Sequence, residues 1–271
     1  MPGDFVSGSV SEFQELVADR MRELFYEGSP PTSRGAAFKG NTRRHFVMPL
    51  GLLLVIDEAN GGDITARELA KRFHLLHEES GNIIDFYFLG WEWTVPGNRS
   101  KGIRFNLDSF KSCRIALRRL GIKSFGGNAD LILVDAHHWF QPSVPGASKA
   151  APKGVGPSGI TLDFREAIHV NLSSQKEEKE IPPVGEFLQS IIRAAEEVRA
   201  SVAGDDEAGV VFSISDTLGL ATAKKSVLDF IYEKWGSIIG ARRLAALTVR
   251  NLGPMVKLED LSIDAIAQGA A

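Results

Sequence analysis

Three carboxylates follow the most apolar run of the chain, in a polar turn at residues 57–63. They belong to Asp57, Glu58 and Asp63, and two glycines stand between the second and the third. Carboxylate oxygens are the ligands that Mg²⁺ takes in proteins. Asp135 follows another apolar run and would join Asp57 and Asp63 in a metal site if its strand were parallel to the first. The favoured interpretation is an ordinary turn that the glycines permit.

Histidines offer a second place for chemistry. His137 and His138 follow Asp135 directly, and His169 lies in a later apolar segment. Adjacent residues of a strand point to opposite faces, so both members of the first pair cannot easily bind one metal. If the two segments pair, one of these histidines approaches His169 or Glu166, which would suit a metal or a general base. Surface or cross-strand pairing histidines are the favoured interpretation.

Bulk composition limits the class of protein. The chain has 271 residues, of which 44% are hydrophobic, and a net charge of −3. A chain of this size buries a core without disulfides or metals. The overall charge disfavours nucleic acid as a partner, although the loop Arg34–Arg44 holds four cations and no acid, as a phosphate-binding patch would.

The chain has one cysteine, Cys113, so internal disulfides and paired-cysteine redox chemistry are excluded. It lies on the apolar stripe of an expected helix, where cysteine behaves as a small hydrophobe. The first residues lack a signal peptide's apolar stretch, and the most apolar run, Val47–Ile56, is about half the length that spans a bilayer. We therefore expect a cytoplasmic protein with no membrane insertion.

Hydrophobic periodicity predicts strands alternating with helices. Glu68, three residues after Thr65, forms a capping box at the start of one helix, and Asn106 or Asp108 caps another. Continuous apolar runs predict strands that are buried on both faces. The predicted strands are Leu50–Ile56, Ile83–Leu89, Leu131–Val134 and Ile160–Leu172, and the predicted helices are Ser11–Tyr26, one from Thr65, one ending at Gly121 and one after Pro183.

From Leu50 to Ala200 this order is strand, helix, strand, helix, strand, strand, helix. It resembles a thioredoxin-like fold in the order of elements alone, and an open Rossmann-like sheet remains the alternative. We expect an α/β core in which the first two strands are parallel neighbours and the last two pair antiparallel. The resemblance places redox cysteines at the start of the first crossover helix, where this chain has Gly61, Gly62 and Asp63.

We expect three parts in the chain. Residues 1–45 form a helix and the basic loop, 46–203 the α/β core, and 204–271 a helical extension with a loose tail. Two helices are predicted there, Ala223–Trp235 and Ile238–Leu252. The face bearing Val227, Ile231 and Trp235 would bind a protein partner or a second copy of the chain. The Pro/Gly-rich segment Pro142–Gly159 is predicted to be a long loop.

Two functions are compatible with these features. The first is a non-redox ligand- or partner-binding module, for which a regulatory role is one option and the sequence identifies no cofactor. The second is a metal-dependent nuclease or phosphoesterase that uses Mg²⁺ with Asp57, Glu58, Asp63 and Asp135. The segment Leu52–Glu58 is similar to the first acidic strand of PIN and NYN nucleases and to a Walker B strand. The phosphate-binding loop that accompanies a Walker B strand is missing.

Overall fold

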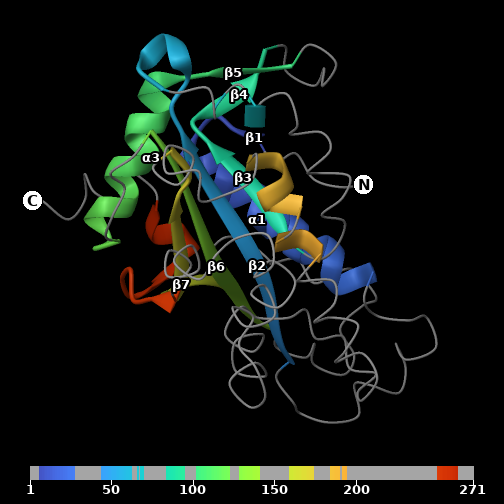
Figure 1. Cartoon of the computed structure of the whole chain (residues 1–271). Helices are drawn as coiled ribbons and strands as arrows, with labels where there is room; N and C mark the ends of the chain where they lie inside the picture. The colour runs from blue at the N-terminus through green and yellow to red at the C-terminus, as the bar shows by residue number, and fades with distance from the viewer. Residues whose placement is uncertain are drawn as a thin grey trace, which may run out of the picture.

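The computed structural model describes residues 6–27, 44–62, 66, 68–69, 84–94, 102–122, 128–140, 159–173, 184–189, 191–193 and 249–261. Its centre is a seven-stranded mixed sheet in the order β1-β3-β2-β6-β7-β8, with β9 also paired to β7 (Figure 1). The protein is therefore an α/β protein with a mixed central sheet. The strands of this sheet are β1 (Val6–Ser7), β2 (Arg44–Val55), β3 (Asp85–Leu89), β6 (Ala129–Phe140), β7 (Ile160–Asn171), β8 (Val249–Arg250) and β9 (Met255–Lys257).

The sheet has a parallel half and an antiparallel half. β1, β3 and β2 run parallel, with Leu50 of β2 opposite Asp85 of β3. β6 runs antiparallel to β2, and β7 runs antiparallel to β6. The parallel pairing of the first two predicted strands and the antiparallel pairing of the last two are both confirmed.

Both faces of the sheet are covered. Leu50, Leu52 and Leu54 of β2 pack on one face with α1 (Val10–Glu27) and α3 (Leu107–Arg119). Leu53 and Val55 pack on the other face, with apolar side chains of the helical residues 184–189 and 191–193. In Figure 1, α1 passes behind the strands and these later helical residues lie in front of them. The continuous apolar run of β2 is thus buried on both sides, as predicted.

The predicted helices that precede residue 194 agree with the described residues there. Asn106 is the N-cap of α3, and its side-chain oxygen accepts a hydrogen bond from the Ser109 amide at 3.1 Å. Residues 66, 68 and 69 are helical, and Leu69 is buried. Thr65 and Pro183, which were expected to open two of the helices, lie outside the described residues.

Two strands are longer than the sequence predicts. β2 begins at Arg44 instead of Leu50, and β6 continues through Asp135 to Phe140 instead of ending there. The two strands pair over their whole length, so backbone hydrogen bonds between them hold these polar ends in the sheet. Pro49 is tolerated within β2 because β3 begins to pair only at Leu50, so no strand of the described chain needs its missing N–H.

The end of the chain also differs from its prediction. Residues 249–261 form β8, β9 and the 3-10 helix η5 (Leu258–Leu261), so a helix as far as Leu252 and a loose tail are wrong for this segment. Leu258 is buried, and its carbonyl accepts a hydrogen bond from the Gln14 side chain of α1 at 2.6 Å. Residues expected to flank the core at both ends therefore belong to its sheet. The predicted helix Ala223–Trp235 and the loop 142–158 lie outside the described residues.

α1 is tied to the sheet by a buried ion pair. Arg20 Nε donates to Asp85 Oδ2 at 3.0 Å, and the two side chains are 3% and 2% exposed. A buried charge needs its partner, because removing that partner leaves the charge out of water and uncompensated.

We expect Arg20→Met to lower the free energy of unfolding by about 3–5 kcal/mol, because it leaves Asp85 buried without its cation. The double variant Arg20→Met/Asp85→Leu should recover most of this loss, because no charge then remains buried. Urea unfolding of both variants and the wild type measures the difference. A double variant less stable than the single variant would contradict the explanation.

Candidate functional site

The acidic turn lies at the edge where the parallel strands end. Asp57 follows β2 and is the N-cap of the 3-10 helix η1 (Glu58–Asn60), without a side-chain capping bond. Gly61 has a φ of 92°, and the Gly62 amide donates to the Asp57 carbonyl at 2.9 Å. The carboxyl ends of parallel strands are where open α/β sheets bind ligands. The structure thus places Asp57 and Glu58 at this edge, while Asp63 lies outside the described residues.

A two-stranded hairpin stands at the same edge. It consists of β4 (Trp91–Trp93) and β5 (Ile103–Phe105) and forms a sheet of its own. Trp91 Nε1 donates to the carbonyl of Val55, the last residue of β2, at 3.0 Å. Gly90 precedes the hairpin with a φ of 81°, and a Cβ there would meet Phe110 at 2.5 Å. The hairpin is therefore fixed to the ends of β2 and β3.

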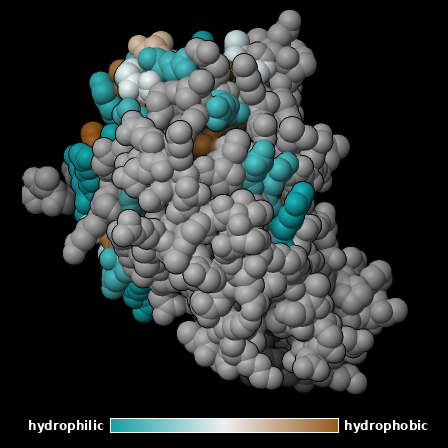
Figure 2. Space-filling view, viewed as in Figure 1, coloured by the Kyte–Doolittle hydropathy of each residue, from teal (hydrophilic) through white to brown (hydrophobic). Residues whose placement is uncertain are grey.

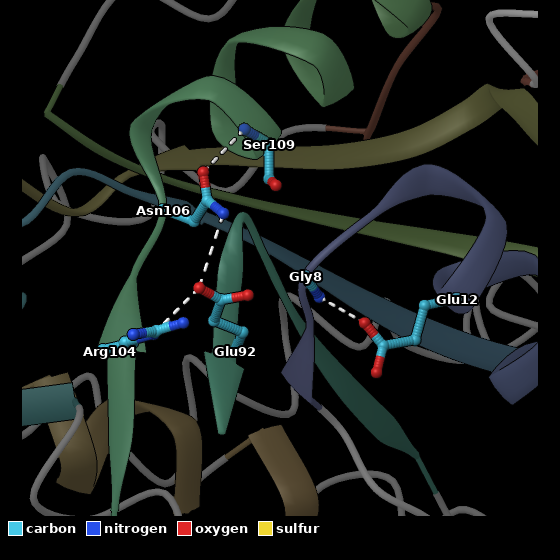
Figure 3. Close-up of polar contacts among 6 residues, drawn as sticks. All are labelled: Gly8, Glu12, Glu92, Arg104, Asn106 and Ser109. Atoms are coloured by element: carbon cyan, nitrogen blue, oxygen red, sulfur yellow. Dashed lines mark hydrogen bonds and ion pairs between the residues drawn. The ribbon is translucent and has the colours of Figure 1, made fainter. Parts of the chain in front are cut away.

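Glu92 is the centre of the polar contacts in Figure 3. Its Oε1 accepts from Arg104 Nε at 2.9 Å and from the Asn106 side chain at 3.4 Å, which links the hairpin to the cap of α3. Glu12 lies nearby and accepts from the Gly8 amide at 2.6 Å. A Cβ on Gly8 would come within 3.4 Å of side-chain atoms of both glutamates. Two carboxylates thus flank the end of β1.

Asp135 lies far from this edge. It is opposite Pro49 of β2 and Asp163 of β7, in the middle of β6. Val55 lies six positions beyond Pro49 along β2, which corresponds to about 20 Å at ~3.3 Å per residue. The structure therefore does not bring Asp57 and Asp135 together.

The histidines form three separate contacts. His138 is buried, and its Nδ1 donates to the Gly159 carbonyl at 2.6 Å; burial lowers its pKa, although this hydrogen bond raises it. His137 points to the other face, where it contributes to lowering the pKa of Asp163. His169 is opposite Ile132, whereas His137 is opposite Thr161, eight residues away along β7. The register thus keeps His137 and His138 apart from His169.

Instead, His169 contacts Asp130, a residue that the sequence did not link to it. His169 Nε2 and Asp130 Oδ1 are 2.8 Å apart, and the two side chains are 11% and 1% exposed. They are diagonal neighbours, because Asp130 is opposite Asn171 and Ile132 is opposite His169. Arg114 of α3 lies near enough for the Asp130 charge to raise the arginine's pKa, although burial and Arg118 lower it overall. Only the β6–β7 register identifies this pair.

Asp163 and Arg165 form a second contact that the sequence did not show. Asp163 accepts from the Arg165 guanidinium at 2.9 and 2.6 Å and from its amide at 3.0 Å. These hydrogen bonds hold the pKa of Asp163 below its ordinary value of 3.8, against burial, which raises it. The carboxylate is therefore ionised at neutral pH.

No three histidines, cysteines or carboxylates of the described residues are grouped as they would be to hold a metal ion. None of the described helices is both long and apolar enough to cross a membrane. Arg44 is described only as part of β2, and Arg34–Arg43 lie outside the described residues.

Comparison with known proteins adds no functional assignment. No protein family, curated protein or solved structure matches this chain.

Cys113 lies on the buried face of α3, and burial raises the pKa of its thiol to about 12. We expect no labelling of native protein by a maleimide at mildly alkaline pH, because the reactive thiolate is not populated. Labelling should be complete in denaturant. Mass spectrometry measures both, and rapid labelling of folded protein would contradict this placement.

We expect Arg165→Gln to raise the pKa of Asp163, because the charge-assisted hydrogen bonds that favour its carboxylate are lost. Carboxyl NMR titration measures this shift, and Arg104→Gln serves as an exposed control that should leave Asp163 unchanged. The depressed native pKa contributes stability above the unfolded value, and that contribution is lost as pH falls through the native pKa. The stability difference between wild type and Arg165→Gln should therefore shrink below about pH 3.8. An unchanged titration would show that Arg165 does not set this pKa.

Proposed function

We propose that the protein is a non-redox binding module that engages a partner protein at the edge where β2 and β3 end. The β4–β5 hairpin carries this proposal. It forms a sheet of its own, and it is fixed by Trp91 and by Gly90 at the edge where the parallel strands end, which is where open α/β sheets bind ligands. Isolated two-stranded hairpins are at best marginally stable, so these anchors are what keep its shape.

The hairpin presents groups suited to a partner. The Arg104 side chain is 62% exposed and is oriented by Glu92, which is 30% exposed. Arg104 is opposite Glu92 on one face of the hairpin, whereas Trp93 is opposite Ile103 on the other face and is partly buried against the core. Tryptophan and arginine are the residues that most often dominate protein interfaces.

We further propose a thioredoxin-like arrangement for the core. It is supported by the parallel β3–β2 pair beside the antiparallel β6–β7 pair, with helical residues between the strands. The alternative, an open Rossmann-like sheet, receives less support because β6 and β7 reverse direction. Dithiol exchange is excluded for such a fold here, because the chain has one cysteine and it is buried.

A metal-dependent nuclease receives less support from the geometry. This hypothesis needs Asp57 and Asp135 at one edge of the sheet, whereas Asp135 lies in the middle of β6, about 20 Å from the end of β2. The C-terminal face at Val227, Ile231 and Trp235, proposed for a partner or a second copy, lies outside the described residues.

The test is selection of ligands from a displayed random-peptide library on the immobilised full chain. We expect selected peptides to bind Trp93→Ala and Arg104→Gln at least about tenfold more weakly, as for interface hot spots. Fluorescence anisotropy measures the affinities, and Lys257→Gln, an exposed cation on β9, is the control that should bind normally. Arg104→Gln should fold normally because the Arg104 side chain is mostly exposed, so a loss of binding by this variant is not explained by misfolding. Peptides that bind both hairpin variants like the wild type would refute the proposed site.

A further inference from the structure

α3 carries a basic stripe on its solvent-facing side. Lys111, Arg118 and Arg119 are exposed, and Arg114 is partly buried. These four cations and the single carboxylate Asp108 give the helix a net charge of +3, in a chain whose net charge is −3. Figure 2 shows hydrophilic residues along the side of the molecule where Figure 1 places α3. The positive charge is thus local and concentrated.

The charges of the three exposed cations of the stripe are not neutralised within the described part of the chain, whereas the partly buried Arg114 interacts with the charge of Asp130. No ion pair there engages Lys111, Arg118 or Arg119. The helix dipole favours cations in the last turn, which accounts for Arg118 and Arg119. It does not account for Lys111, about two turns earlier. Arg114, stacked 5.6 Å from the Phe110 ring centre, has its pKa lowered by burial and then by Arg118.

An exposed isoleucine stands within the stripe. Ile115 is 47% exposed, one of the two large apolar side chains that are exposed in the described chain. It follows Lys111 by four residues and precedes Arg118 and Arg119 by three and four. Residues at these spacings are neighbours on a helix surface. The stripe therefore offers an apolar centre with cations at both ends.

We infer that the face formed by Lys111, Ile115, Arg118 and Arg119 docks an acidic, amphipathic segment of a partner protein. Carboxylates of such a segment would meet the cations, and an apolar side chain between them would cover Ile115. This inference rests on the proposed binding function and adds a second surface to it, since α3 begins directly after the hairpin.

Two other kinds of negatively charged partner fit the α3 face less well. A nucleic acid is a long polyanion, which the net negative charge of the chain repels outside this helix, and its phosphates leave Ile115 uncovered. A membrane surface needs a broad apolar face to insert, whereas this face has one apolar residue. A short acidic peptide matches both the extent of the positive charge and the single apolar contact.

The probe is a synthetic, fluorescently labelled helical peptide of glutamate and leucine, titrated against the full chain at roughly 0.15 M salt. We expect measurable binding that Lys111→Gln/Arg118→Gln/Arg119→Gln weakens about tenfold, because three exposed charge contacts are lost. Ile115→Ser should weaken this peptide several-fold but leave binding of plain polyglutamate unchanged. A thermal melt of each variant checks folding, which these exposed positions should not disturb.

Matched controls separate local charge from general attraction. Asp108→Asn removes an acid from the same helix and should bind the peptide equally or more tightly. Lys257→Gln removes an exposed cation elsewhere and should have no effect. The hairpin variant Trp93→Ala should retain the peptide, because its surface is a different one.

Equal binding by the triple variant, or no binding by the wild type, would overturn the α3 inference. The proposed binding function would then be judged only by whether the library-selected peptides bind at the hairpin. Binding of a duplex oligonucleotide or of anionic phospholipid vesicles more tightly than the peptide, with the same dependence on the three cations, would also overturn it. Selected peptides that bind both hairpin variants like the wild type, together with binding of the acidic peptide that depends on the three cations, would refute the hairpin site alone.

Discussion

The twelve-residue antiparallel ladder between β2 and β6 is the constraint on which the rest of the structure depends. It runs without a break from Arg44 opposite Phe140 to Val55 opposite Ala129. β2 is buried on both faces and has a parallel neighbour on its other side, so it fixes the direction of every strand near it. The edge at which β2 ends is therefore also the edge at which β6 begins, and the hairpin, the acidic turn and the cap of α3 are fixed relative to it.

The charged residues of the described chain fall into two groups according to their exposure to water. The first group is buried beside the sheet, where Asp85 pairs with Arg20 and Asp130 contacts His169, because a carboxylate out of water needs a partner. Those beyond the strand ends or on the outer side of α3 remain in contact with water. Arg104, Lys111 and Arg118 belong to this second group, and it is there that another molecule can reach a charge.

Much of the core could be predicted from local pattern. Apolar runs located the four central strands, and Asn106 located the start of α3, because burial and capping are encoded within a few residues. Strand ends were less predictable. Asp135 was expected to end its strand, yet it and the histidines after it remain in the sheet because strands on both sides supply backbone hydrogen bonds. Only the paired strands determine how far such a strand continues.

By itself the sequence determined that this is an α/β protein without paired-cysteine chemistry. A count of one cysteine and the local apolar runs can be interpreted without knowing which distant residues are in contact. Tertiary structure alone decided which chemical groups meet. The β6–β7 register pairs His169 with Asp130 and leaves His137 beside Asp163, and the strand direction separates Asp135 from Asp57. Tertiary structure also placed β8 and β9 in the sheet beside β7. The reason is that periodicity reports which side of a residue is buried, whereas register is a property of two strands distant in sequence.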